Sequence, residues 1–235
     1  REAKNLPVIM FPHGGPAGHD EAHFDWWAQA FASRGYAVFQ PNFRGSDNRD
    51  QAFERAGYGE WGRKMQTDIS DGLAELARQG IVDPKRACIM GASYGGYAAL
   101  AGVTLQHGLY RCSVSVAGVS DIMDLYNKRN YRSGDSAMTW RSMQESYGKP
   151  ETFAAVSPRR HAADADAPIM LIHGKDDTVV DFAQSSAMAS ALDSAGKPHE
   201  LVVLQHEDHW LSRGETRLEM LQAAMRFVQQ HNPAN

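Results

Sequence analysis

The pentapeptide GASYG at residues 91–95 has the composition of a turn that presents a serine for chemistry. An apolar run, RACIM, precedes it, and a run of small residues, YAALAGV, follows it. Glycines two positions before and after Ser93 remove the Cβ atoms that would collide in a tight turn from a strand into a helix. The helix dipole would then favour negative charge developing at the serine. We therefore predict that Ser93 is a nucleophile; the alternative is an ordinary serine in a glycine-rich turn.

A serine hydroxyl is a weak nucleophile without a base, so the same chemistry requires a histidine and an acid. After a G-x-S-x-G turn, the acid and then the histidine are expected beyond later strands. The run IMLIH leads into GKDDTVV, with Asp176 and Asp177, and the run LVVL leads into QHEDHW, with His206 and His209. We expect Asp177 to be the acid and His209 the base. Asp176 is then a solvated turn residue and His206 a loop residue.

Histidine is frequent in this chain, with ten in total, and four follow predicted strands: His13, His173, His206 and His209. The last two form an H-x-x-H pair, which has the form of part of a metal site. That spacing usually needs presentation on a helix and a third ligand. We therefore expect no metal and no cofactor.

An oxyanion would form when Ser93 attacks a carbonyl group, and fixed N–H donors must meet it. One donor is expected from the backbone of Tyr94 and another from the loop after the first strand, PHGGPAG. Adjacent glycines let this backbone approach a substrate closely. We choose Gly15 as the second donor, with Gly14 as the neighbouring alternative. A simple Gly-Pro turn is the purely structural explanation.

Six short apolar runs, separated by helical patterns, must position these residues. The predicted strands cover residues 7–11, 36–41, 86–90, 112–117, 168–173 and 199–204. Apolar spacing predicts helices over 23–34, 64–79, 94–105 and 182–195, and a last helix with Leu218, Leu221, Met225 and Val228. Strands that alternate with helices predict an α/β fold whose mostly parallel sheet has helices on both faces. Ligands bind at the carboxyl edge of such sheets.

The segment 118–165 interrupts this alternation, and we interpret it as a helical excursion over the carboxyl edge of the sheet. Its aromatic residues either line an apolar substrate pocket or form a small core of their own: Tyr126, Tyr131, Trp140 and Tyr147. Val119 is another candidate wall of that pocket. Arg44 and Arg160 are candidate partners for a substrate carbonyl or carboxylate, although solvated arginine explains each as well.

The bulk composition indicates a soluble globular protein with one catalytic domain over residues 1–235. Its 235 residues are 43% hydrophobic and 22% charged, with a formal net charge of −4. This balance favours neither a nucleic-acid nor a membrane partner, and no apolar run is long enough to span a bilayer. Cys88 and Cys112 lie in strand-like runs, and we expect two buried free thiols. Cytoplasm and periplasm both stay open, as does assembly into a homo-oligomer.

Four stretches together resemble the catalytic domain of the prolyl oligopeptidase family of serine peptidases: HGGP at 13–16, GASYGG at 91–96, HGKDDTVV at 173–180 and EDHW at 207–210. The closest resemblance is to acylaminoacyl-peptidase and dipeptidyl-peptidase-like members. The motifs NFRGS at 42–46 and YGEWGRKMQTDI at 58–69 are similar as well. The resemblance extends over residues 8–210. It implies an α/β-hydrolase fold and the cleavage of short peptides through an acyl-enzyme.

The resemblance also implies roles for single residues. A D-x-x-V pattern matches Asp177 through Val180, the family histidine matches His209 within EDH, and the oxyanion donors match Tyr94 and Gly15. Members of the family usually carry an N-terminal β-propeller that screens substrates, and this chain shows none. A propeller domain or fragment from the same precursor is therefore an expected partner, beside the substrate itself.

Three hypotheses follow from the sequence. The first is a serine hydrolase that cleaves peptide or acyl-peptide bonds through Ser93, His209 and Asp177. The second is a carboxylesterase of the same fold, since ester bonds are easier to break. The third, from another class, is a non-catalytic binding module on the same scaffold.

Overall fold

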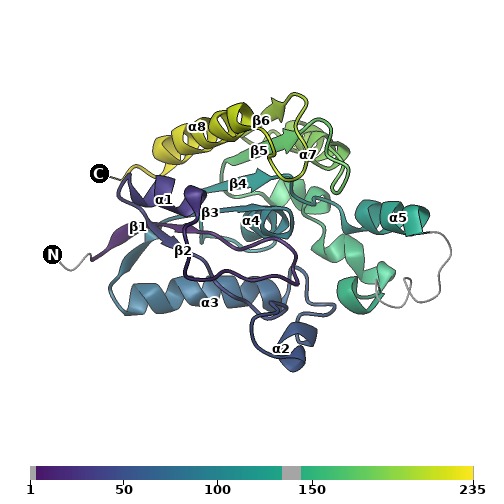
Figure 1. Cartoon of the computed structure of the whole chain (residues 1–235), viewed down its shortest axis with the longest axis horizontal. Helices are drawn as coiled ribbons and strands as arrows, with labels where there is room; N and C mark the ends of the chain where they lie inside the picture. The colour runs from purple at the N-terminus through teal and green to yellow at the C-terminus, as the bar shows by residue number, and fades with distance from the viewer. Residues whose placement is uncertain (1–3, 134–143, 235) are drawn as a thin grey trace.

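A single sheet of six parallel strands forms the centre of the molecule (Figure 1). The computed structural model describes residues 4–133 and 144–234. Its strands are β1 (Leu6–Met10), β2 (Ala37–Phe39), β3 (Val82–Ala92), β4 (Cys112–Val116), β5 (Ile169–Gly174) and β6 (His199–Leu204). Each adjacent pair is parallel, and the spatial order is β2-β1-β3-β4-β5-β6. The predicted α/β-hydrolase fold class is therefore confirmed.

The strand order places a topological switch point between β1 and β3. The chain leaves β1 toward β2 on one side and returns to β3 on the other side of β1. The loops after β1 and β3 therefore diverge, and ligands of open α/β sheets bind at such a switch point. Gly15 follows β1 and Ser93 follows β3, so the topology alone brings these two candidates to one crevice.

Helices cover both faces of the sheet, as the sequence predicted (Figure 1). On one face α3 (Lys64–Arg78), α4 (Tyr94–Thr104) and α7 (Ala183–Ser194) share a buried apolar cluster with alternate strand residues such as Val8 and Met10. On the other face α1 (Trp26–Ala32) and α8 (Gly214–His231) pack against residues such as Ile9. A strand buried on both faces needs apolar residues on both, which explains the nearly continuous apolar runs.

Two elements differ from the sequence-based expectation. The strand β3 begins at Val82 rather than near residue 86. A short helix, α2 (Gln51–Arg55), lies in a region for which no helix was predicted. It begins with the Asp50 side chain accepting a hydrogen bond from Phe53 N at 2.8 Å. At five residues it is too short to show an apolar period.

The segment 118–165 is helical in its described parts. It contains α5 (Ile122–Ser133), helical residues 144–147, and the 3₁₀ helices η1 (Pro150–Val156) and η2 (Pro158–Asp164). Tyr126 and Tyr147 are buried against Phe153 and Trp61, and all four belong to the main core rather than to a core of their own. Val119 is also buried in the main core. Trp140 and the Tyr131 side chain lie outside the part of the chain that the structure describes.

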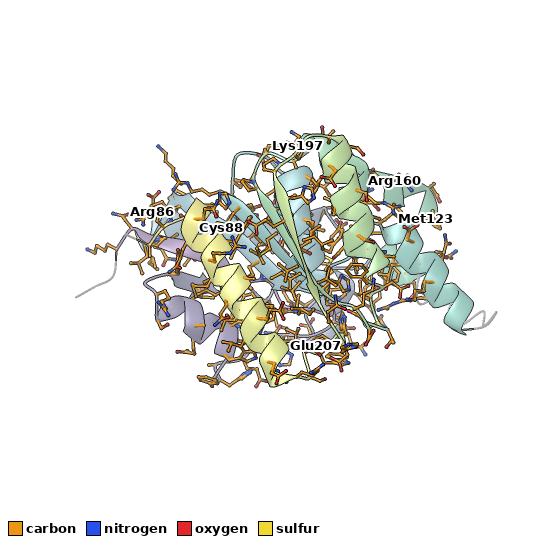
Figure 2. All side chains as sticks on the ribbon, turned by 90° about the horizontal axis from the view of Figure 1, so that it is seen from above. Arg86, Cys88, Met123, Arg160, Lys197 and Glu207 are labelled. Carbon is orange, nitrogen blue, oxygen red and sulfur yellow. A yellow bond between two sulfur atoms is a disulfide. The ribbon has the colours of Figure 1, made fainter. Side chains whose placement is uncertain are left out.

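Cys88 and Cys112 form a disulfide, so the expectation of free thiols was wrong. The two residues are direct partners in the register of β3 and β4, and their Cα atoms are 4.8 Å apart. That separation suits a disulfide, and both residues belong to the buried layer between the sheet and α8, where Figure 2 labels Cys88. The sequence shows two strands but not their pairing, so the register that joins the sulfurs was not visible in it.

Candidate active site

Ser93 lies in the sharp turn between β3 and α4 and has a backbone φ of 58° with ψ of −117°. A residue other than glycine rarely adopts a positive φ, and such strain is concentrated at functional sites. Two close approaches explain the flanking glycines. A Cβ on Gly91 would lie 2.6 Å from the carbonyl carbon of Gly95, and one on Gly95 would lie 2.1 Å from the oxygen of Pro12. Only glycine fits at either position.

The loop after β1 lies directly against this turn. A Cβ on Gly14 would lie 3.5 Å from the Cβ of Ser93, and Gly15 has a φ of +125° that favours glycine. His13 anchors the loop, because its ring stacks on Phe43 at 4.4 Å and its Nε2 lies 2.8 Å from Ser46 Oγ. Burial lowers the pKa of His13. His13 therefore holds the loop that contains the glycines in place, and it is not bonded to Asp177 as His209 is.

His209 is hydrogen-bonded through its Nδ1 to Oδ2 of Asp177, at 2.7 Å. The two side chains are 6% and 0% exposed, so water has little access to the bond. Oδ1 of Asp177 accepts from the backbone N–H groups of Val179 at 2.8 Å and Val180 at 2.9 Å. Burial alone would raise the pKa of Asp177, but hydrogen bonds from His173 and His209 hold that pKa well below its usual range.

His173 is a supporting residue to which the sequence assigned no role. It is fully buried at the end of β5, its Nε2 donates to the carbonyl oxygen of Val180 at 2.9 Å, and the same nitrogen lies 3.2 Å from Oδ2 of Asp177. Both neighbours of Nε2 are acceptors, so Nε2 must carry the proton. Ser185 Oγ lies 2.7 Å from Nδ1 and can donate to it. Oδ2 of Asp177 thus lies between two imidazoles.

Glu207 holds the loop that carries His209, and the sequence analysis missed it too. Its side chain is buried and accepts backbone N–H bonds from Asp208 at 2.9 Å, Ser212 at 3.0 Å and Arg213 at 3.2 Å. A buried carboxylate needs such donors, because its charge has lost its water. The only signal in the sequence was its place in the motif EDHW.

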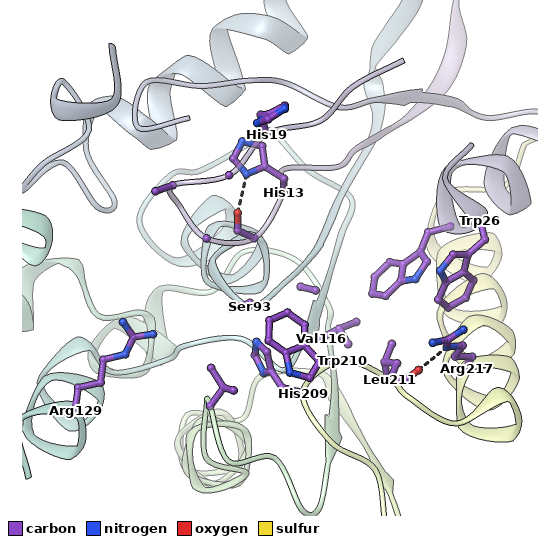
Figure 3. Close-up of a pocket in the computed structure, with 17 residues that line it drawn as sticks. His13, His19, Trp26, Ser93, Val116, Arg129, His209, Trp210, Leu211 and Arg217 are labelled. Carbon is purple, nitrogen blue, oxygen red and sulfur yellow. Dashed lines mark hydrogen bonds between the residues drawn. The ribbon is translucent and has the colours of Figure 1, made fainter. Parts of the chain in front are cut away.

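A cavity of about 660 Å³ opens at the carboxyl edge of the sheet, and its lining includes Ser93, His209 and Gly15 (Figure 3). No hydrogen bond joins the side chains of Ser93 and His209, both of which are among the described residues. Such bonds often tighten only when substrate is bound. Tyr94 follows Ser93 at the start of α4, and its side chain is buried.

The other candidates lie elsewhere. Asp176 and His206 are exposed, with 3.8 Å between their side chains. Arg44 forms two bonds to Asp68, each of 2.7 Å, and Arg160 binds Asp121 at 2.9 Å, so each has a carboxylate partner. Neither lines the cavity, whereas Arg129, which the sequence analysis did not consider, does.

Two further observations concern ions and membranes. Within residues 4–133 and 144–234, no three His, Cys, Asp or Glu side chains are grouped so that they could hold a metal ion. The helices in those same ranges include none that is both long enough and apolar enough to cross a membrane.

The sheet order, the turn after β3 and the helices on both faces define an α/β-hydrolase fold. A model of the prolyl oligopeptidase family matches residues 22–233. The chain therefore belongs to the prolyl oligopeptidase family, as the motifs predicted. The match does not include the HGGP loop at 13–16.

Individual relatives agree with the family. Dipeptidyl aminopeptidase BIII of Pseudoxanthomonas mexicana is 32% identical over 216 residues, which are 89% of this chain and 31% of the relative. A puromycin-hydrolyzing peptidase of Mycobacterium tuberculosis superposes with a TM-score of 0.89 at 27% identity, over 100% of this chain and 35% of the other. The acylaminoacyl peptidase of Pyrococcus horikoshii gives 0.88 at 28% identity, over 99% and 38%. The chain thus spans about a third of these proteins.

Proposed function

We propose that this chain is the catalytic part of a serine peptidase that cleaves peptide or acyl-peptide bonds through an acyl-enzyme. One observation carries the proposal: the imidazole of His209 is bonded to buried Asp177 at 2.7 Å and lines the same cavity as Ser93. Family membership and relatives named as dipeptidyl and acylaminoacyl peptidases support a peptide substrate rather than a simple ester.

The proposed reaction begins when Ser93 Oγ attacks the carbonyl carbon and His209 Nε2 takes the hydroxyl proton. Since Nδ1 of His209 donates to Asp177, Nε2 is the nitrogen left free to act as base. The protonated imidazole then gives its proton to the leaving amine, and the C–N bond breaks. Water repeats the sequence on the acyl-enzyme, and the acid product leaves with Ser93 restored.

Two backbone groups would stabilise the oxyanion: the N–H of Tyr94 and the N–H of Gly15. Tyr94 begins α4, so its N–H belongs to a helix N-terminus, where the dipole adds to the hydrogen bond. Gly15 lies across the crevice on the loop after β1 and lines the cavity. Asp177 stays ionised throughout, because its four donors favour the carboxylate over the acid.

The test compares the chain with its Ser93→Ala variant. We expect a fluorophosphonate probe to label the former on Ser93 and leave the variant unlabelled. Aminoacyl and N-acetyl-aminoacyl anilides should lose about three to six powers of ten in kcat in the variant. Anilide turnover that survives Ser93→Ala overturns the proposal. Rapid turnover of p-nitrophenyl esters with no anilide cleavage would favour the esterase, and a folded sample that never reacts with the probe would favour the binding module.

A further inference from the structure

Aromatic side chains gather in one part of the cavity around Ser93. Its lining includes three indoles and a leucine: Trp26, Trp27, Trp210 and Leu211. We call these four residues the aromatic wall. The lining also includes two cations: Arg129 on the opposite side of His209, and Arg217 beside the wall, where its Nε donates to the carbonyl oxygen of Leu211. Figure 3 shows Trp26 and Leu211 on one side of His209 and Arg129 on the other.

The aromatic wall is held by ring contacts that fix its shape before any substrate binds. Trp27 is buried and stacks on Phe11, with ring centroids 5.4 Å apart and 15° between the planes. Trp26 packs edge-on against Trp27 at 5.4 Å and 71°. Trp210 packs edge-on against the imidazole of His209 at 5.3 Å and 89°. Rings fixed in this way lose little conformational freedom when they contact a ligand.

Trp210 is 74% exposed, although indole is one of the most costly side chains to leave in water. Among the described residues four other large apolar side chains are also exposed, and none of them lines this cavity: Phe24, Tyr58, Ile81 and Leu218. Single exposed apolar residues are common on surfaces. An exposed indole in contact with the proposed base, within a cavity that already holds two more, indicates a ligand surface instead.

The proposed mechanism places the aromatic wall on the leaving-group side of the cleaved bond. The inference therefore rests on the proposed function. The leaving nitrogen must lie over His209 to receive its proton. Trp210 and Leu211 follow His209 directly in the chain, so a group that departs across the imidazole meets the aromatic wall. We infer that the aromatic wall is the leaving-group subsite and that it selects substrates with an aromatic or large apolar residue directly after the cleaved bond.

The acyl-enzyme offers a direct measure of such a subsite. An amine that binds at the aromatic wall can replace water: its nitrogen attacks the acyl carbon, and the bond from that carbon to Ser93 Oγ breaks. His209 accepts the proton of the amine and returns it to Oγ. The products are a new amide and the free serine, so the ratio of amide to acid reports how well the amine is bound.

The experiment forms the acyl-enzyme from the p-nitrophenyl ester of N-acetylglycine and adds either L-phenylalaninamide or glycinamide at equal concentration. We expect phenylalaninamide to capture the acyl group about tenfold more often than glycinamide, since roughly one aromatic side chain leaves water. Trp210→Ala and Trp26→Ala should each bring the two amines within about twofold of each other. Phe24→Ala is the matched control, because Phe24 is 75% exposed and lies outside the cavity lining.

Three results would overturn the inference. In the first, the two variants retain the full preference for phenylalaninamide. In the second, the two variants keep the preference for phenylalaninamide but change the discrimination between N-acetylglycyl and N-acetylphenylalanyl esters. The aromatic wall would then bind the acyl group. In the third, the native chain turns over the ester without any amine preference, which contradicts the subsite and leaves the proposed function standing. If the chain forms no acyl-enzyme, that result contradicts the proposed function and the subsite together.

Discussion

Asp177 and Ser93 are proposed to serve one reaction, but the structure holds them in different ways. Asp177 is buried among four donors, and its hydrogen-bond partner His209 lies on a loop that Glu207 fixes in turn. Ser93 is constrained only through its backbone, with a φ of 58° and an N–H bond to Val116 O at 2.9 Å. Its hydroxyl has no hydrogen bond to any described residue.

This difference shows that the acid–base pair and the nucleophile are positioned by different kinds of interaction. An acid–base pair works best when its geometry is set in advance, because reorganisation during the reaction would add to the barrier. A nucleophile must instead stay free to move onto the substrate. Hydrogen bonds therefore fix the acid and base, whereas glycine sterics fix the turn that presents the serine. Substitutions that remove these hydrogen bonds should differ in their effects from substitutions that disturb the glycine turn.

Of the variants that test this comparison, Asp177→Asn should have the largest effect on activity, because the amide would no longer favour the Nδ1–H form of His209. We expect kcat to fall by about 10⁴-fold and fluorophosphonate labelling of Ser93 to slow as well, while the chain stays folded. Stability should change with pH as well. The folded-state pKa of Asp177 is lowered, so the carboxylate stabilises the fold above its unfolded pKa of about 4 and loses this as pH falls through the folded value.

Urea unfolding at several pH values measures that dependence. The free energy of unfolding of the native chain should exceed that of Asp177→Asn at pH 7, and the gap should close as the pH drops below about 4. A gap that is independent of pH would show that the lost stability does not come from the carboxylate charge.

Gly95→Ala should disturb the glycine turn that presents Ser93. The added Cβ would lie 2.1 Å from Pro12 O, which cannot move without shifting β1 and its loop. We expect about 3 kcal/mol of lost stability and a matching fall in the urea midpoint. Gly214→Ala is the control, because a Cβ there meets nothing within 4 Å. Equal midpoints for the two variants would contradict the steric account of the turn.

His173 tests whether support of Asp177 reaches the chemistry. In His173→Gln the side-chain amide can reach the place of Nε2, next to Val180 O and Asp177, whereas in His173→Asn it reaches only the place of Nδ1, next to Ser185. We expect kcat to fall about tenfold in the Asn variant, with roughly twofold loss in the Gln variant. KM should change little in both.

Urea midpoints separate this positioning effect from a general loss of folding. If the Gln and Asn variants lose kcat equally, or if kcat simply follows the midpoint, then His173 has a structural role and no part in orienting Asp177.

Much of this arrangement could be predicted from the sequence, and the limits have physical causes. The six strands were predicted because buried parallel strands read as apolar runs, and Ser93 was singled out because its flanking glycines have a steric purpose. The disulfide was missed because strand register is a tertiary property. His173 and Glu207 bond to residues in the loops and the helix that follow them, and no local sequence pattern reveals how those segments fold back. Arg129 points into the cavity only because α5 crosses near it.

The central claim is that Ser93, His209 and Asp177 work as one unit, and a crystal structure of the chain with a phosphonate bound covalently tests it most directly. We predict a bond from phosphorus to Ser93 Oγ, with His209 Nε2 within hydrogen-bond distance of that oxygen or of the leaving-group position. A phosphoryl oxygen should face the N–H groups of Gly15 and Tyr94. A phosphonate attached to another residue, or a His209 imidazole turned away from Ser93 in the adduct, would contradict the account.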